Sequence, residues 1–188
     1  GSLTYALALT PQDVVKLDFN AYDTKSIGDG KGLATSGDKT IWSATAAYTL
    51  GAHTFLVGRQ VVNGTGNYRY GVDGNSTIFV GNSVQYSDFN NANEKSWQAR
   101  YDLNMATYGV PGLSFMTRYV MGSDATTSTG DNGNSWERDI EAKYVIQSGP
   151  AKDLSFRVRN ATYRSGVSDL NAKVDDTRVI IEYPISIL

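Results

Sequence analysis

The segment Ser96–Met105 reads SWQARYDLNM, and its apolar residues occupy every second position. One parity holds Trp97, Ala99, Tyr101, Leu103 and Met105, and the other holds Ser96, Gln98, Arg100, Asp102 and Asn104. A period of two places alternate side chains on opposite faces of a β-strand. The segment therefore predicts an extended strand with one apolar face and one polar face.

The same period recurs along the chain. It predicts further strands at Leu3–Leu9, Val14–Tyr22, Thr40–Leu50, Thr54–Val62, Leu113–Met121, Ser135–Ile146, Asp153–Ser165 and Thr177–Ile187. Most of these nine strands span about 9–11 residues, the length that a tilted strand needs to cross a bilayer. Strands of soluble domains are nearer 5–6 residues. No segment has the period of a helix, so the sequence predicts an all-β antiparallel fold.

The connections between these strands alternate in length. Short turns fall at Thr10–Asp13, Gly51–His53, Ala106–Gly112 and Gln147–Lys152, and longer polar segments fall at Thr24–Lys39, Asn63–Lys95, Gly122–Asn134 and Gly166–Asp176. This order places the short turns at one rim and the long loops at the other, as in outer-membrane barrels. It favours a transmembrane β-barrel over a soluble domain.

Aromatic residues occupy the apolar parity of the strands. They are Trp42, Tyr48, Trp97, Tyr101, Phe115, Tyr119, Trp136, Tyr144, Phe156 and Tyr183. Several lie near strand ends, where amphipathic rings sit at a membrane–water interface. The alternative is a soluble all-β module whose aromatic residues form a core and whose tyrosines bind a sugar or another ligand. The regular polar alternation on the opposite face favours the barrel.

Composition excludes several classes of function. The chain of 188 residues has no cysteine, one histidine and a formal net charge of −2. These counts exclude a disulfide framework and Cys-based zinc sites, and they give no basic footprint for nucleic acid. A Ser-His-Asp hydrolase is a weak alternative, because His53 lies in a short turn. The sequence thus predicts no enzyme, no cofactor and no metal site.

Basic residues gather on one parity of three consecutive strands. They are Lys143, Arg157, Arg159 and Arg178, and Arg100 and Arg118 share this parity. Facing lipid, each would cost roughly 2–4 kcal/mol at mid-depth, so we expect them to face a lumen. There they form a ladder of weak sites for carboxylates, since arginine holds a carboxylate with two hydrogen bonds. The alternative is a salt-bridge lattice with Asp139, Glu141 and Glu182 that braces the wall.

The stretch 63–95 is long for a connection and contains a strand-like run, Ile78–Tyr86. A loop of this length is uncommon in a compact domain unless it has a function or is disordered. Its ordered pattern favours a functional loop.

Several segments resemble the OprD-type substrate-specific porins of Gram-negative outer membranes. They are AAYTLGAHTF (46–55), NSVQYSDFN (82–90), EKSWQARYDLN (94–104), YGVPGLSFMTRY (108–119), WERDIEAKYVIQSGPAKDLSFRVR (136–159) and EYPISIL (182–188). The resemblance implies an eighteen-stranded barrel that passes small carboxylate-bearing molecules, either amino acids or cyclic carboxylates, as a monomer or loose trimer in outer-membrane lipid. Residues 1–188 would be a single barrel domain or its C-terminal half, which needs the N-terminal half or another piece to close.

The resemblance also assigns residues to the channel. The four residues of the basic ladder match a basic ladder of the family. The loop 63–95 corresponds to one that folds into the lumen, where Ser83, Tyr86 and Asp88 match positions at the constriction. Asp88 would then give a negative pole opposite the arginines, with the Ser83–Asp88 segment across the narrowest point from them. The alternative for Asp88 is a turn aspartate that bonds local backbone groups.

Overall fold

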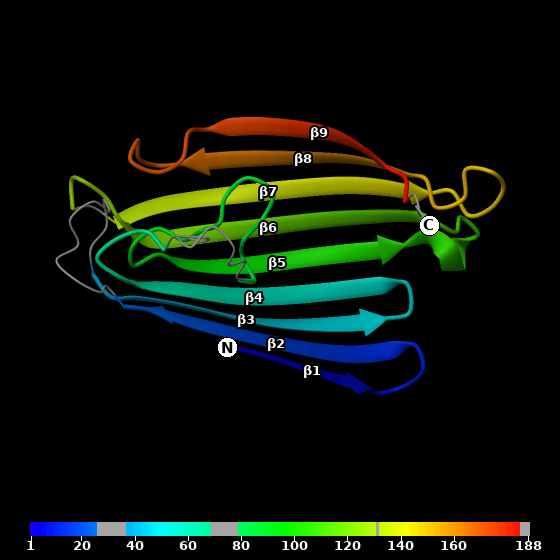
Figure 1. Cartoon of the computed structure of the whole chain (residues 1–188), viewed down its shortest axis with the longest axis horizontal. Helices are drawn as coiled ribbons and strands as arrows, with labels where there is room; N and C mark the ends of the chain where they lie inside the picture. The colour runs from blue at the N-terminus through cyan, green and yellow to red at the C-terminus, as the bar shows by residue number, and fades with distance from the viewer. Residues whose placement is uncertain (26–36, 69–78, 131, 185–188) are drawn as a thin grey trace.

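Nine antiparallel strands form a single sheet in which every strand pairs with its neighbours in the sequence (Figure 1). The computed structural model describes residues 1–25, 37–68, 79–130 and 132–184. The strands are β1 (Ser2–Ala8), β2 (Asp13–Thr24), β3 (Lys39–Leu50), β4 (His53–Gly64), β5 (Lys95–Asn104), β6 (Leu113–Thr126), β7 (Asn132–Val145), β8 (Ser155–Ser165) and β9 (Val174–Glu182). The nine predicted antiparallel strands are confirmed.

A short 3-10 helix, Met105–Tyr108, is the one helical element of the described residues. The Asn104 side chain accepts the Ala106 backbone N–H at its start, and Gly109 ends it with a φ of 83°. No helix in this part of the chain is long and apolar enough to cross a membrane.

The two faces of the sheet follow the predicted parity. Exposed apolar residues of the outward face include Leu17, Phe19, Trp97, Phe115, Tyr144, Val179 and Ile181, and Val15, Tyr101 and Leu103 are partly exposed on the same parity. Since the strands form one sheet, these residues do not meet in a core between two sheets. The soluble sandwich is therefore wrong for this chain.

The predicted loop Gly122–Asn134 is largely strand. Strands β6 and β7 pair as far as Thr126 and Asn132, across a register shift between Gly122 and Ala125. A β-bulge of this kind adds a residue to one strand without ending the pairing, so the loss of alternation there does not mark a loop. The connection shrinks to residues 127–131, and the strict alternation of loop lengths is wrong in this half of the sheet. The connections still alternate between the two ends of the sheet (Figure 1).

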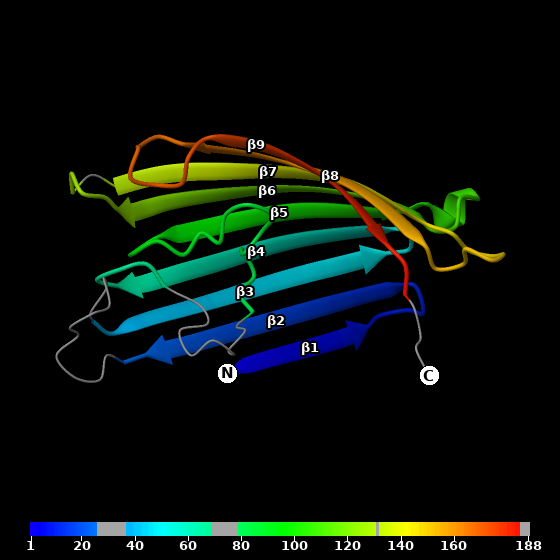
Figure 2. The ribbon, with the colours of Figure 1, turned by 45° about the horizontal axis from the view of Figure 1, so that its top comes forward.

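Residues 79–94, here named the crossing segment, lie across one face of the sheet (Figure 2). The segment contacts Ser43 on β3 through Gly81 and Asp176 on β9 through Gln85. Six strand spacings, or about 29 Å along the sheet, separate β3 from β9. Residues 81–85 would span about 14 Å if fully extended, and a turn at Gly81–Asn82 and a bend at Gln85 shorten them. Even with the side chains of Ser43 and Gln85 added, this connection falls short of a flat sheet's span. The sheet must therefore curve around the crossing segment, which lies on its concave face.

The predicted strand Ile78–Tyr86 is wrong for the residues that are described. Residues 79–86 form turns and bends, and Ile78 lies outside the described residues. Their backbone groups bond mainly to side chains of the wall, as described below, so no strand ladder forms. The end of the predicted strand Thr177–Ile187 also lies outside the described residues, as does most of Thr24–Lys39.

Candidate functional site

Three side-chain amides anchor the crossing segment to the concave face of the sheet. One is on β4, one is on β5 and the third belongs to the segment itself. Gln60 is fully buried; its Oε1 accepts the Asn82 backbone N–H at 3.0 Å, and its Nε2 donates to the carbonyls of Asp88 and Phe89 at 2.8 and 2.9 Å. Asn82 Nδ2 donates to Ser96 Oγ at 2.8 Å, and Gln98 Nε2 donates to the Gly81 carbonyl at 2.9 Å. A buried amide satisfies donor and acceptor together, which fixes the backbone of the crossing segment.

Gly81 allows a close approach to β3. Its N–H donates to Ser43 Oγ at 2.9 Å, and a Cβ at this position would lie 2.7 Å from the Thr45 methyl carbon. Any side chain would therefore push the segment away from the wall.

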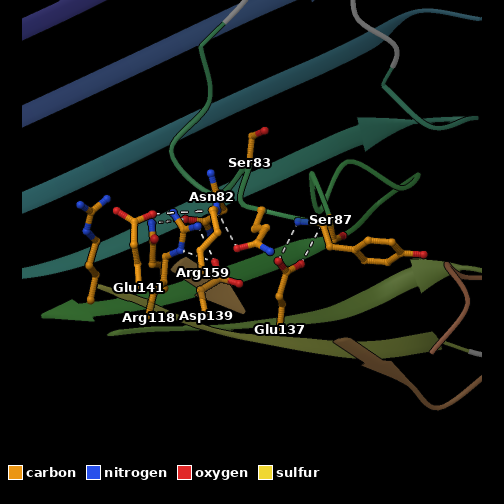
Figure 3. A network of polar contacts seen from close by, with 12 residues as sticks. Asn82, Ser83, Ser87, Arg118, Glu137, Asp139, Glu141 and Arg159 are labelled. Carbon is orange, nitrogen blue, oxygen red and sulfur yellow. Dashed lines mark hydrogen bonds and ion pairs between the residues drawn. The ribbon is translucent and has the colours of Figure 1, made fainter. Parts of the chain in front are cut away.

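Glu137 on β7 anchors the middle of the crossing segment (Figure 3). Its two carboxylate oxygens accept the backbone N–H groups of Tyr86 at 2.8 Å and Ser87 at 2.7 Å. Beside this contact, Phe89 packs with Val120 and Tyr163 in a buried cluster, and the Tyr86 ring lies 5.3 Å from that of Tyr163. The hydrogen bonds from Glu137 and the apolar burial of Phe89 thus hold the same part of the crossing segment.

Gln85 reaches the far side of the concave face. Its Oε1 accepts Arg159 Nε at 2.7 Å, and its backbone carbonyl accepts Arg178 Nη2 at 3.3 Å. Its Nε2 donates to the Asp176 carbonyl at 3.1 Å. One uncharged residue therefore contacts two of the predicted ladder residues, Arg159 through its side chain and Arg178 through its backbone carbonyl.

Within the Ser83–Asp88 segment, Gln85 thus contacts two of the basic residues, Arg159 and Arg178, directly. The Asp88 carboxylate accepts the Ser83 hydroxyl at 2.5 Å, inside the segment itself. No ion pair joins Asp88 to an arginine among the residues that the structure describes. Asp88 as a negative pole opposite the arginines stays a prediction, and in this structure its carboxylate is held by a local hydrogen bond within the segment. Tyr86 points its hydroxyl at the Ala172 carbonyl, 3.4 Å away.

The predicted basic residues share the concave face with an equal number of carboxylates. On β5–β9 the cations are Arg100, Arg118, Lys143, Arg157, Arg159 and Arg178, and the carboxylates are Asp102, Glu137, Asp139, Glu141, Asp176 and Glu182. The charges on this face are thus balanced. The individual cations differ in how closely a carboxylate approaches them.

Three cations are held closely. Arg118 Nη2 lies 2.5 Å from Asp139 Oδ2, and both side chains are largely buried. Arg100 makes two hydrogen bonds to Asp102, at 2.7 and 2.8 Å. Arg178 Nη2 lies 2.6 Å from Asp176 Oδ2 on its own strand. These bonds occupy the guanidinium edges that would otherwise bind an anion.

Three cations are held loosely or not at all. Arg157 Nε lies 3.7 Å from Glu141, and this buried nitrogen has no hydrogen-bond partner. Arg159 lies 3.9 Å from the same carboxylate. Lys143 is partly exposed and forms no ion pair with any described residue. A solute anion can therefore bind these three without displacing a carboxylate in close contact, although Arg159 Nε already donates to Gln85.

Glu94 ends the crossing segment and is buried. Its Oε2 accepts the backbone N–H of Asn91 at 3.0 Å and the Asn91 side-chain amide at 2.7 Å, while its Oε1 has no hydrogen-bond partner. Burial raises the pKa of the Glu94 carboxyl above its ordinary value, against the lowering effect of the Asn91 bonds.

The sequence did not single out Gln85, Gln60 or Glu137 as site residues. Gln85 carries no charge, and nothing in its segment NSVQYSDFN (82–90) distinguishes it from its neighbours. A signal did exist for the docking of the crossing segment: Ile41, Val62 and Val120 are apolar residues on the polar parity. The structure buries them with Tyr68, Val80 and Phe89.

Comparison with known proteins agrees with this architecture. Residues 1–187 match the model of the OprD family of outer membrane porins. The chain is 45% identical to Porin D of Pseudomonas aeruginosa over 98% of this chain and 46% of that porin. It is 35% identical to the porin-like protein GalP of Pseudomonas putida over 86% of this chain and 38% of that protein.

Solved structures give the same result. The chain superposes on the crystal structure of Pseudomonas aeruginosa OprD with a TM-score of 0.89 at 45% identity, over 100% of this chain and 53% of that one. It superposes on Pseudomonas aeruginosa OpdK, solved with vanillate, with a TM-score of 0.81 at 31% identity, over 98% of this chain and 47% of that one. The chain spans about half the length of these relatives. The chain therefore belongs to the OprD family of outer-membrane porins, whose members are channels and not enzymes.

Proposed function

We propose that the protein containing this chain is an outer-membrane channel for passive uptake of small carboxylate-bearing solutes. In this proposal the concave face is one side of the channel wall, the remaining strands complete the barrel, and the crossing segment narrows the lumen. The observation that carries it is the contrast among the wall cations: Lys143, Arg157 and Arg159 lack close carboxylate partners. The vanillate in the OpdK crystal structure is itself an aromatic carboxylate, which agrees with this solute class.

The geometry supports a route along the wall and not a single tight site. Lys143 and Arg157 are directly opposite each other on β7 and β8, and Arg157 and Arg159 are two residues apart on β8. Two residues along a strand span about 6.8 Å, so an anion passes between neighbouring cations in short steps. A transport site must release its solute, and several moderate sites in series allow release more readily than one strong site.

Conductance of the intact protein in planar bilayers tests the proposal. We expect Arg157→Gln and Lys143→Gln to shift the reversal potential toward cation selectivity. We also expect each to lower carboxylate flux about tenfold, the value of one charged hydrogen bond of about 1.5 kcal/mol. Arg138→Gln is the matched control, because Arg138 lies on the outward parity of the same strand as Lys143. Wild-type selectivity and flux in both lumen variants would show that the lattice only braces the wall.

A further inference from the structure

The outward face carries an arginine that has no carboxylate partner. Arg59 on β4 stacks on the Trp97 ring of β5, with its guanidinium carbon 4.7 Å from the ring centroid. Among the described residues Arg59 forms no ion pair. A lipid-facing cation is costly unless an anion or water satisfies it, so this position calls for a partner from outside the chain.

Arg59 lies in one register row with two tryptophans, Trp97 and Trp136. The register places Arg59 beside Trp97, Trp97 beside Met121, and Met121 beside Trp136, all with outward parity. Tryptophans collect at the membrane–water interface, which is also the depth of lipid phosphates. Because stacking uses the face of the guanidinium, its N–H edges stay free to bind an anion.

An apolar hollow runs from Arg59 toward the short-turn end of the sheet. Its volume is about 510 Å³, and it lies between Leu17 and Phe19 on β2 and Val57 and Arg59 on β4. Its floor is β3, where the outward residues Ala44 and Ala46 are small. Because the side chains on β3 are shorter than those on β2 and β4, the three strands form a groove parallel to their direction.

We propose that this groove binds one acyl chain of an anionic phosphorylated lipid, whose phosphate lies on Arg59. The charge of Arg59 selects the headgroup, and the apolar groove selects the chain below it. Free phosphate does not fit this role, because the outward side chains beneath the cation are apolar and cannot hold it. The proposal depends on the membrane position of the outward face but not on solute selectivity.

Native mass spectrometry of the intact protein in detergent tests the site with two probes, dioleoyl phosphatidylglycerol and dioleoyl phosphatidylcholine. We expect Arg59→Gln to weaken phosphatidylglycerol binding about fivefold, the value of one cation near an anionic headgroup. Phosphatidylcholine binding should weaken less, because the choline cation offsets the charge of its phosphate. Ala44→Leu fills the groove and keeps Arg59, so it should also weaken phosphatidylglycerol binding.

Two controls distinguish binding at this groove from general binding of lipid or anions. Arg138→Gln removes another outward arginine, which already donates to Thr162 Oγ1 at 3.1 Å, and it should leave lipid binding unchanged. Inorganic phosphate should not displace the lipid. Wild-type binding of phosphatidylglycerol by both Arg59→Gln and Ala44→Leu, equal loss of the two lipids in Arg59→Gln, or displacement by phosphate would each overturn the proposal. Channel selectivity should stay unchanged in Arg59→Gln, so failure here is distinct from failure of the proposed channel function.

Discussion

The Glu137 carboxylate accepts the backbone N–H of Ser87 at 2.7 Å, which joins β7 directly to the segment that crosses the concave face (Figure 3). The neighbouring N–H of Tyr86 donates to the other carboxylate oxygen. A single side chain of β7 therefore fixes two consecutive peptide groups, with one hydrogen bond to each.

Removing this carboxylate should free the crossing segment. We expect Glu137→Ala to lower the free energy of unfolding by about 1.5–3 kcal/mol, because two hydrogen bonds to the segment are lost. The loss is not larger because water takes the place of the carboxylate in part. It should also raise the single-channel conductance and its fluctuations. Urea unfolding in micelles and bilayer recording measure the two effects. Glu182→Ala removes an exposed carboxylate of the same face and should change neither value appreciably. A quiet channel of wild-type conductance in Glu137→Ala would contradict the anchoring role.

Removal of one partner of the Arg118–Asp139 pair should destabilise the folded protein. Asp139→Ala leaves a guanidinium that is only 10% exposed without its carboxylate. We expect a loss of about 3–5 kcal/mol in urea unfolding for such a broken buried pair. The double variant Arg118→Met/Asp139→Leu removes both charges and should lie within about 1.5 kcal/mol of the wild type. Equal losses in the single and double variants would show that the charge pairing is not the cause.

Gly122 should tolerate no side chain. A Cβ there would collide with Glu94 Oε1 and lie 2.9 Å from Phe89 Cδ1, both in or at the end of the crossing segment. We expect Gly122→Ala to cost about 1–3 kcal/mol, as for an overpacked core, and to speed proteolysis of the segment. Gly166→Ala is the control, because its Cβ would meet nothing closer than 3.6 Å. Equal proteolysis rates in the two variants would refute the close approach.

Glu94 should make stability depend on pH. Burial raises the pKa of its carboxyl in the folded state above the unfolded value, so the folded state binds the proton more tightly. This contribution is fully present below the unfolded pKa and is lost as the pH rises through the folded pKa. From about pH 4 to about pH 8, the free energy of urea unfolding of the wild type should therefore fall relative to that of Glu94→Gln. A constant difference between the two proteins across this range would contradict the shifted pKa.

The sequence predicts the sheet well because the physical signal is local. Each strand shows its two faces within its own residues, as Trp97 and Gln98 do, and antiparallel neighbours follow from short connections. The bulge after Gly122 breaks that local pattern without breaking the pairing, so strands β6 and β7 extend beyond their predicted ends.

The site was only partly predictable because its contacts join distant residues. The parity of the strands correctly places Arg157, Arg159 and Arg178 on one face of the sheet. It does not reveal which carboxylate lies near each cation. It gives no information on Gln85, whose partners are set by how far the sheet curves. Apolar residues on the polar parity, such as Val62 and Val120, were the available sign that a segment packs there.

The bonds of Gln85 have a consequence for the order of folding. Its partners Arg159 and Arg178 stand 74 and 93 positions later in the chain, whereas each strand pairs with the next one along. Closing so long a loop has a larger entropic cost than forming a hairpin, and contacts between distant residues form slowly. The segment can reach its final place only after β8 and β9 have joined the sheet. In the channel proposed above, the lumen therefore narrows only after β8 and β9 have paired.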